Sequence, residues 1–96
     1  MKTLDEIKII LEEHKEELRE KYKVKKIGVF GSYVRGEQDE ESDLDVLVEF
    51  DAPVGFEFIH LADFLEEVTG IKVDLVTPDG IKPNRWKYIK EDLVYV

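Results

Sequence analysis

The chain has 96 residues, of which 43% are hydrophobic and 39% are charged, and its formal net charge is −9. These values predict a single small globular domain spanning residues 1–96 and exclude a disordered chain. The absence of cysteine excludes disulfides and thiolate metal sites, and the excess of 23 acids over 14 bases opposes direct, non-specific binding to nucleic acid.

Two further features of the composition bear on where the protein works. No apolar run approaches the length of a membrane span, and the N-terminus lacks a signal-peptide core, so we expect no membrane partner and a cytoplasmic location. Lys and Glu dominate the charged residues, whereas Gln38 and Asn84 are the only side-chain amides. This bias is typical of proteins from thermophiles.

The N-terminal segment predicts one long helix, from Thr3 to about Tyr22. Thr3 followed by Glu6 forms a capping box, which is typical of a helix start. Apolar residues then recur at helical spacing, so one side of the helix is expected to face the core. The residues on that side are Leu4, Ile7, Leu11, His14 and Leu18, with Ile10 beside them.

Shorter apolar runs, separated by turn residues, predict the rest of the fold. We expect strands at about 26–30, 43–50 and 72–76, one helical turn at 32–35, helices at about 56–69 and 83–92, and a short strand within 93–96. This order predicts an α/β (α+β) fold with a small mixed sheet of three to four strands flanked by helices. The first two strands are expected to be antiparallel, and the second and third, which straddle a helix, to be parallel.

Two carboxylates open the second predicted strand. Asp43 and Asp45 are spaced one residue apart, so on a strand they share a face and lie about 6.5 Å from each other. Such a pair can converge on one or two hard cations, which would offset the cost of charge beside an apolar strand. The alternative is an ordinary acidic strand start in which Ser42 and Asp43 are turn residues.

A third carboxylate, Asp74, lies inside the third predicted strand, where aspartate is uncommon. If this strand neighbours the second, Asp74 joins Asp43 and Asp45 at one end of the sheet. The alternative is an edge position at which Asp74 pairs with Lys72 or with a helix residue.

Gly31 and Ser32 follow the first predicted strand and suit a phosphate-binding turn. Glycine permits a tight backbone, and successive N–H groups at a helix start bind anions, to which the serine hydroxyl adds a donor. Arg35 suits either contact with a triphosphate or a pairing that holds the loop onto an acid. The alternative for the turn is an ordinary strand-to-helix connection with Ser32 as the N-cap.

Taken together, these residues resemble the signature of the DNA polymerase β-type nucleotidyltransferase superfamily, and in particular its minimal nucleotidyltransferase (MNT) domains. The resemblance covers nearly the whole chain and implies a polymerase β-like palm fold. Val34 departs from the commonest form of the loop, which has alanine there. The segments that carry the resemblance are Gly31-Ser32-Tyr33-Val34-Arg35-Gly36, Ser42-Asp43-Leu44-Asp45-Val46-Leu47-Val48 and Val73-Asp74-Leu75.

The resemblance implies a role for each matched residue. Asp43 and Asp45 match Mg²⁺ ligands that hold the nucleoside triphosphate, and Asp74 matches the third carboxylate, which binds the catalytic metal and can activate the acceptor hydroxyl. Two Mg²⁺ ions are implied as cofactors and ATP as the substrate. The nucleotide-binding residues are then Gly31, Ser32, Arg35 and Ser42, of which the first two match those that hold the β- and γ-phosphates.

The resemblance also implies a partner. Larger relatives carry helical domains that bind the acceptor, and none is visible here, so we expect a partner chain to recognise the acceptor or to be the acceptor. MNT proteins often pair, as antitoxins, with helical HEPN-type RNase toxins and can adenylylate a tyrosine of the toxin. The leading hypothesis is therefore transfer of AMP to such a partner. The alternatives are neutralisation of a basic partner by binding alone and nucleotidyl transfer to a small molecule, and a homodimer is left open.

Overall fold

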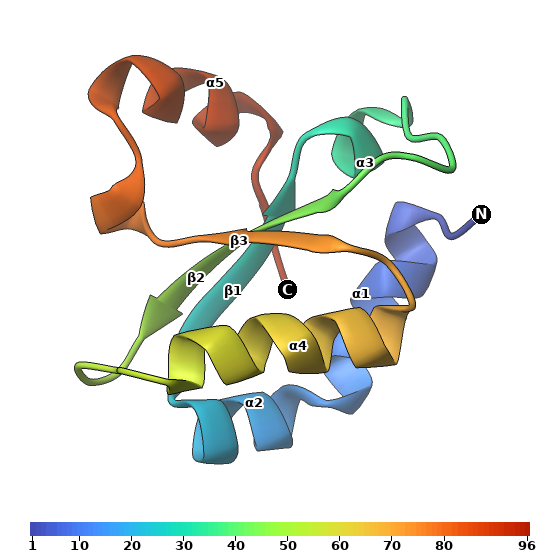
Figure 1. Ribbon diagram of the computed structural model, residues 1–96. Coiled ribbons are helices and arrows are strands. Elements are labelled where there is room, and N and C mark those ends of the chain that lie inside the picture. The colour runs from blue at the N-terminus through green and yellow to red at the C-terminus, as the bar shows by residue number, and fades with distance from the viewer.

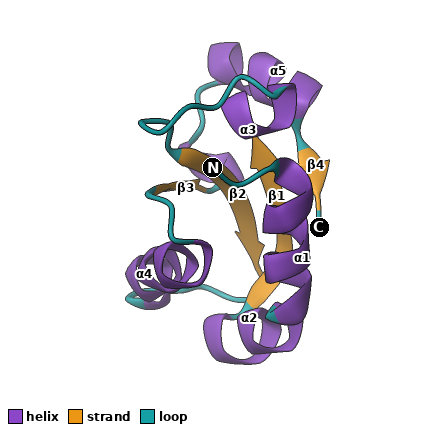
Figure 2. Ribbon diagram, turned by 90° about the vertical axis from the view of Figure 1, so that its right-hand side faces the viewer, coloured by secondary structure: helices purple, strands orange, loops and turns teal.

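The computed structural model describes residues 1–96 as a mixed sheet of four strands with five α-helices and one short 3₁₀ helix (Figures 1 and 2). This architecture confirms the predicted fold class. None of the helices combines the length and apolar character needed to traverse a bilayer. The elements in chain order are α1 (Leu4–Glu13), α2 (Lys15–Tyr22), β1 (Val24–Phe30), α3 (Ser32–Arg35), β2 (Leu44–Phe50), α4 (Glu57–Thr69), β3 (Val73–Val76), η1 (Pro78–Gly80), α5 (Pro83–Asp92) and β4 (Val94–Tyr95).

The sheet has the strand order β3-β2-β1-β4, with β1 antiparallel to both of its neighbours and β2 parallel to β3. Both pairings predicted from the connections are therefore confirmed. The connection from β2 to β3 contains α4, which returns the chain to the starting end of the sheet. As a result β2 and β3 begin side by side, next to the end of β1 (Figure 1).

The two faces of the sheet are covered unequally. Along β2, Val46 and Val48 pack into the main core with α1, α2 and α4 on one side of the sheet. Leu47 points to the other side, where it meets Phe30 and Ile89 of α5 in a much smaller cluster. Figure 1 shows α4 and α2 below the sheet and α5 above it. The second face is therefore only partly covered.

The expected long N-terminal helix is interrupted, so that prediction is wrong at one residue. His14 has φ −108° and ψ 12°, and its backbone N–H bonds to Leu11 instead of continuing the α-helical ladder. The His14 ring Nδ1 donates to the Ile10 carbonyl at 2.8 Å, which occupies the acceptor that the helix would have used. The apolar side survives the break, because Leu11 and Leu18 remain buried in the same core.

The first strand also begins earlier than expected, at Val24 instead of about residue 26. Lys23 ends α2 with φ 63°, so the chain turns directly into the sheet. Val24 pairs with Phe50 and Lys26 with Glu49, and the shift between these two pairs marks an irregularity that a simple apolar pattern does not reveal.

A glycine inside β1 provides a test of how the sheet meets its last strand. A Cβ atom on Gly28 would lie 2.8 Å from Cδ1 of Leu93 and 3.2 Å from the Val94 carbonyl oxygen. We expect Gly28→Val to lower the free energy of unfolding by about 1–3 kcal/mol, because the larger side chain overpacks this contact. Urea denaturation measures the change. Gly55→Ala is the control, since a Cβ there meets nothing within 4 Å; equal stability of the two variants would contradict the prediction.

Candidate functional site

Three aspartates lie at the end of the sheet where β2 and β3 begin. Asp45 in β2 is the register partner of Asp74 in β3, and Asp43 directly precedes β2. Asp43 and Asp74 are exposed, whereas Asp45 is half-buried. Because side chains alternate along a strand, Asp45 and Asp74 belong to the face that carries Leu47 and α5. The structure therefore places at one end of the sheet the three carboxylates that the sequence singles out.

The turn that follows β1 packs against this group. Gly31 has φ 81° and ψ −151°, a conformation that is essentially restricted to glycine. A Cβ atom on Gly31 would also collide with Oδ2 of Asp45, which lies opposite Phe30 in the sheet. The missing side chain thus lets the Asp45 carboxylate lie directly against the backbone of the turn.

Ser32 begins α3 immediately after this turn. The N–H groups of Val34 and Arg35 both bond to the Gly31 carbonyl, at 3.1 Å and 3.2 Å, so the first helical turn is formed. The first amides of a helix lack intrahelical partners, and Ser32 makes no side-chain cap. Backbone donors and a hydroxyl therefore lie one residue beyond the glycine that contacts Asp45.

The Asp45 carboxyl occupies an unfavourable environment for negative charge. Burial and then the charge of Asp74, with a smaller effect from Asp43, raise the pKa of Asp45 to about 6. The cations of Arg85 and Arg35 oppose this shift without cancelling it. This end of the sheet therefore has an excess of negative potential, which a bound cation would relieve.

The carboxylate oxygens at this end of the sheet suit a cation whose remaining ligands come from a bound substrate. No three His, Asp or Glu side chains lie close enough together to hold a metal ion alone, so the expected three-carboxylate metal site is not preformed. Mg²⁺ is usually bound through one or two carboxylates plus the phosphates of a substrate, without a dedicated protein cage. Asp43, Asp45 and Asp74 supply hard oxygens of this kind.

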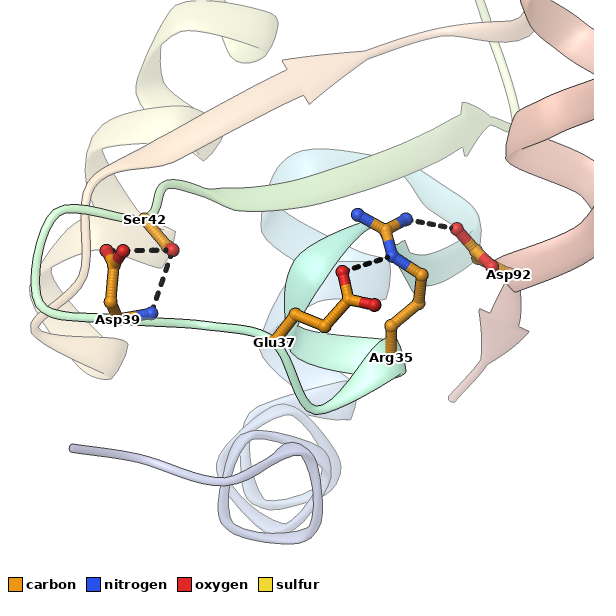
Figure 3. A network of polar contacts seen from close by, with 5 residues as sticks. All are labelled: Arg35, Glu37, Asp39, Ser42 and Asp92. Atoms are coloured by element: carbon orange, nitrogen blue, oxygen red, sulfur yellow. Dashed lines mark hydrogen bonds and ion pairs between the residues drawn. The ribbon is translucent and has the colours of Figure 1, made fainter.

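Arg35 and Ser42, expected among the nucleotide-binding residues, both bond to other side chains (Figure 3). Arg35 Nη1 donates to Oδ2 of Asp92 at 2.6 Å, and its Nε donates to Glu37 at 3.2 Å. These contacts match the alternative in which Arg35 holds the loop onto an acid. The Ser42 hydroxyl accepts the backbone N–H of Asp39 at 2.9 Å and donates to the carboxylate of that residue, which makes it a turn residue here.

Two residues of α5 that shape the site were missed in the sequence. Asp92 accepts a hydrogen bond from Arg35, which lies 57 positions earlier in the chain. The positive charge of Arg85 lowers the pKa of Asp45 and so opposes the effect of burial. No local spacing links either residue to the aspartates. The only feature of the sequence that could have drawn attention to Arg85 is that the chain has just three arginines.

Comparison with known proteins gives one family. Residues 11–96 match the nucleotidyltransferase domain family. The Methanocaldococcus jannaschii protein MJ1379 is 55% identical to this chain over 100 residues, and the match covers 100% of both proteins. Protein adenylyltransferase MntA of Thermococcus cleftensis is 50% identical over 97 residues, covering 100% of this chain and 98% of MntA.

Solved structures agree with this comparison. A minimal nucleotidyltransferase superposes with a TM-score of 0.73 at 28% identity, covering 94% of this chain and 88% of the other. A chain from the complex of a tri-AMPylated Shewanella oneidensis HEPN toxin with an MNT antitoxin gives a TM-score of 0.65 at 20% identity, covering 93% and 70% of the two chains. The second likeness concerns the fold alone.

The contact between Gly31 and Asp45 can be tested by comparing two glycines. Gly31 and Gly36 both have positive φ, but a Cβ on Gly36 would meet no atom within 4 Å. We expect Gly31→Ala to lower the free energy of unfolding by more than 2 kcal/mol and Gly36→Ala by about 1 kcal/mol, because only the first adds a collision to backbone strain. Chemical denaturation measures both. Equal losses would show that the Asp45 carboxylate is free to move aside.

The charge of Asp45 should limit stability at neutral pH. Since the folded-state pKa lies above the unfolded one, the protonated carboxyl favours folding below about pH 4, and this contribution is lost as pH rises through about 6. In metal-free buffer at pH 7 we expect Asp45→Asn to stabilise the fold by about 1 kcal/mol, a figure reduced for solvent screening.

Thermal melts of wild type and Asp45→Asn between pH 4 and pH 8 measure this difference. The exposed Asp63→Asn in α4 is the control, and its melting curve should follow the wild type at every pH. Parallel pH profiles for wild type and Asp45→Asn would contradict the expected destabilisation.

Proposed function

The chain belongs to the nucleotidyltransferase domain family of enzymes, and on this premise we propose that it transfers AMP from ATP to a hydroxyl group of a HEPN-type partner protein. The observation that carries the proposal is the packing of the Asp45 carboxyl between the Gly31 turn and Asp74. That arrangement puts backbone donors for phosphate next to oxygen ligands for a cation, and the two are the main requirements for phosphoryl-group chemistry.

Mg²⁺ is the implied cofactor, and we expect two ions. Asp43 and Asp45 would hold it together with oxygens of the triphosphate, with Asp74 on the side of the acceptor. When bound, Mg²⁺ supplies positive charge that offsets the phosphates and the attacking and leaving oxygens. The raised pKa of Asp45 supports this role, because a cation relieves the repulsion that causes it.

In the proposed transfer, the acceptor oxygen forms a bond to the α-phosphorus, and the bond from that phosphorus to the oxygen leading to the β-phosphate breaks. AMP becomes attached to the acceptor, and pyrophosphate leaves. Asp74, exposed beside Asp45, accepts the proton of the acceptor hydroxyl. The turn at Gly31 and Ser32 donates hydrogen bonds to the leaving phosphates. The protein thus positions the groups and forms no covalent intermediate.

Two observations support a protein acceptor. Relatives covering the whole length of this chain include the protein adenylyltransferase MntA, and a structural neighbour comes from a complex of an AMPylated HEPN toxin with an MNT antitoxin. The net charge of −9 would favour encounter with a basic partner. We expect tyrosine to be the modified residue. A small-molecule acceptor gains no specific support from the site.

The second candidate function is neutralisation of the partner by binding alone. It is favoured by the acidic surface and by the absence of a preformed metal site. The two candidates differ in whether the carboxylates are needed, because an antitoxin that acts by occlusion should tolerate their neutralisation.

Adenylyl transfer is tested with the purified chain, a HEPN-type partner, Mg²⁺ and ATP labelled at the α-phosphate. We expect label on the partner, and a rate at least about 100-fold lower for Asp45→Asn and for Asp74→Asn, because each loses a charged group at the reacting phosphate. Chelation of Mg²⁺ should abolish labelling.

Asp63→Asn serves as the control variant and should label the partner at the wild-type rate. An unlabelled partner in the presence of the native chain would count against transfer. If the Asp45→Asn variant suppressed the toxicity of the partner as fully as the native chain does, binding alone would be the function.

A further inference from the structure

A groove lies at the opposite end of β2 from the three aspartates. Its volume is about 710 Å³, and it is lined by residues from the end of β2, the turn that follows, the start of α4 and the segment around η1. In Figure 1 the turn after β2 and the segment after β3 lie on the left, and α3 lies on the right. We call this feature the β2–α4 groove. No part of the proposed transfer uses it.

The lining of the β2–α4 groove combines apolar and acidic side chains. Phe50 and Phe58 contribute half-buried aromatic rings, which pack edge to face with 6.4 Å between their centroids. Glu49, Asp51 and Asp79 also line the groove, and no Lys, Arg or His does. A ligand that fits must therefore present an apolar group together with positive charge.

Two large exposed apolar side chains stand close in the chain to Phe58, at the start of α4. Phe56 is 74% exposed and Ile59 is 57% exposed, and they flank Phe58 in the chain. The Phe56 ring stacks on His60 at 6.5 Å, so it rests against α4. Scattered apolar residues are common on surfaces, but two exposed ones within two residues of a groove-lining phenylalanine suit a protein interface.

The position of the groove suits a substrate that spans both sites. Glu49 and Asp45 lie on the same strand, four residues apart, and on the same face, whereas Phe50 alternates to the face that α4 covers. The groove therefore lies across the end of the sheet and is reached from the Asp45 face at Glu49. Four residues of strand correspond to about 13 Å, a distance that a protein domain covers easily. A partner held at the groove would keep its acceptor hydroxyl at a high effective concentration near Asp45 and Asp74.

We propose that the β2–α4 groove, with Phe56 and Ile59, is the docking site for a basic segment of the protein acceptor that carries an apolar anchor. This inference rests on the proposed function, since the acceptor is the HEPN-type protein of the proposed pair. The acidic side chains select the basic segment, and the aromatic rings hold the apolar anchor. Docking and chemistry thus use separate residues of this chain.

The test measures affinity for the HEPN-type protein by titration calorimetry at two salt concentrations. The double variant Asp51→Lys/Asp79→Lys should weaken binding about tenfold or more and reduce its salt dependence, because it reverses the charge of the lining. Ile59→Ser should weaken binding about fivefold by removing an apolar contact. Both variants should bind ATP as the wild type does, because neither alters the site at Asp45.

Matched controls lie on the N-terminal helices. Glu13→Lys/Glu16→Lys changes the net charge by the same amount, and Ile9→Ser removes an isoleucine that is 58% exposed. Both controls should bind the partner within about twofold of the wild type. Groove variants that bind no worse than their matched controls would overturn the proposal, as would absence of binding by the native chain.

Two further outcomes separate the hypotheses. A native chain that binds through the groove but transfers no AMP would refute the proposed function and leave the docking site standing. Sedimentation could show that the native chain is a dimer and that the groove variants are monomers. That result would assign the groove to a second copy of this chain and would refute docking of the partner there. Circular dichroism melts would check that both groove variants remain folded. Because the two variants alter different residues, each tests the proposal separately.

Discussion

The close packing of the Asp45 carboxylate against the backbone of Gly31 is the constraint on which the candidate site depends. It requires a residue without a side chain at the end of β1 and a carboxylate opposite it in β2, so the antiparallel register of the two strands is part of the site. The parallel register of β3 then brings Asp74 alongside. A change of one residue in either pairing would turn a carboxylate into the apolar core on the other face.

The unequal covering of the sheet explains how so small a chain has room for a polar site. Three helices cover one face, and most of the core lies there. On the other face α5 contributes Ile89 and leaves the end near Asp45 accessible. The ion pair between Arg35 and Asp92 joins α5 to the loop after β1, so the open face is bounded by a tethered element.

The sequence was most informative where local spacing determines geometry. Connection lengths predicted both strand pairings, and the parallel pairing places Asp74 beside Asp45. It was least informative where a contact spans many residues or where a side chain competes with the backbone. The bond from the His14 ring to Ile10, which breaks the first helix, and the partners of Arg35 depend on such contacts. The absence of a preformed metal site likewise depends on side-chain distances that spacing does not fix.

The contact between Arg35 and Asp92 has a consequence for synthesis of the protein. Asp43, Asp45, Asp74 and the Gly31 turn are made before Asp92, because the chain is synthesised from its N-terminus. Until α5 has emerged and docked, the guanidinium group of Arg35 lacks its partner across 57 residues, and the loop after β1 is untethered. The tether of the loop therefore forms only once Asp92 has been made, later than the carboxylates and the turn that it holds in place.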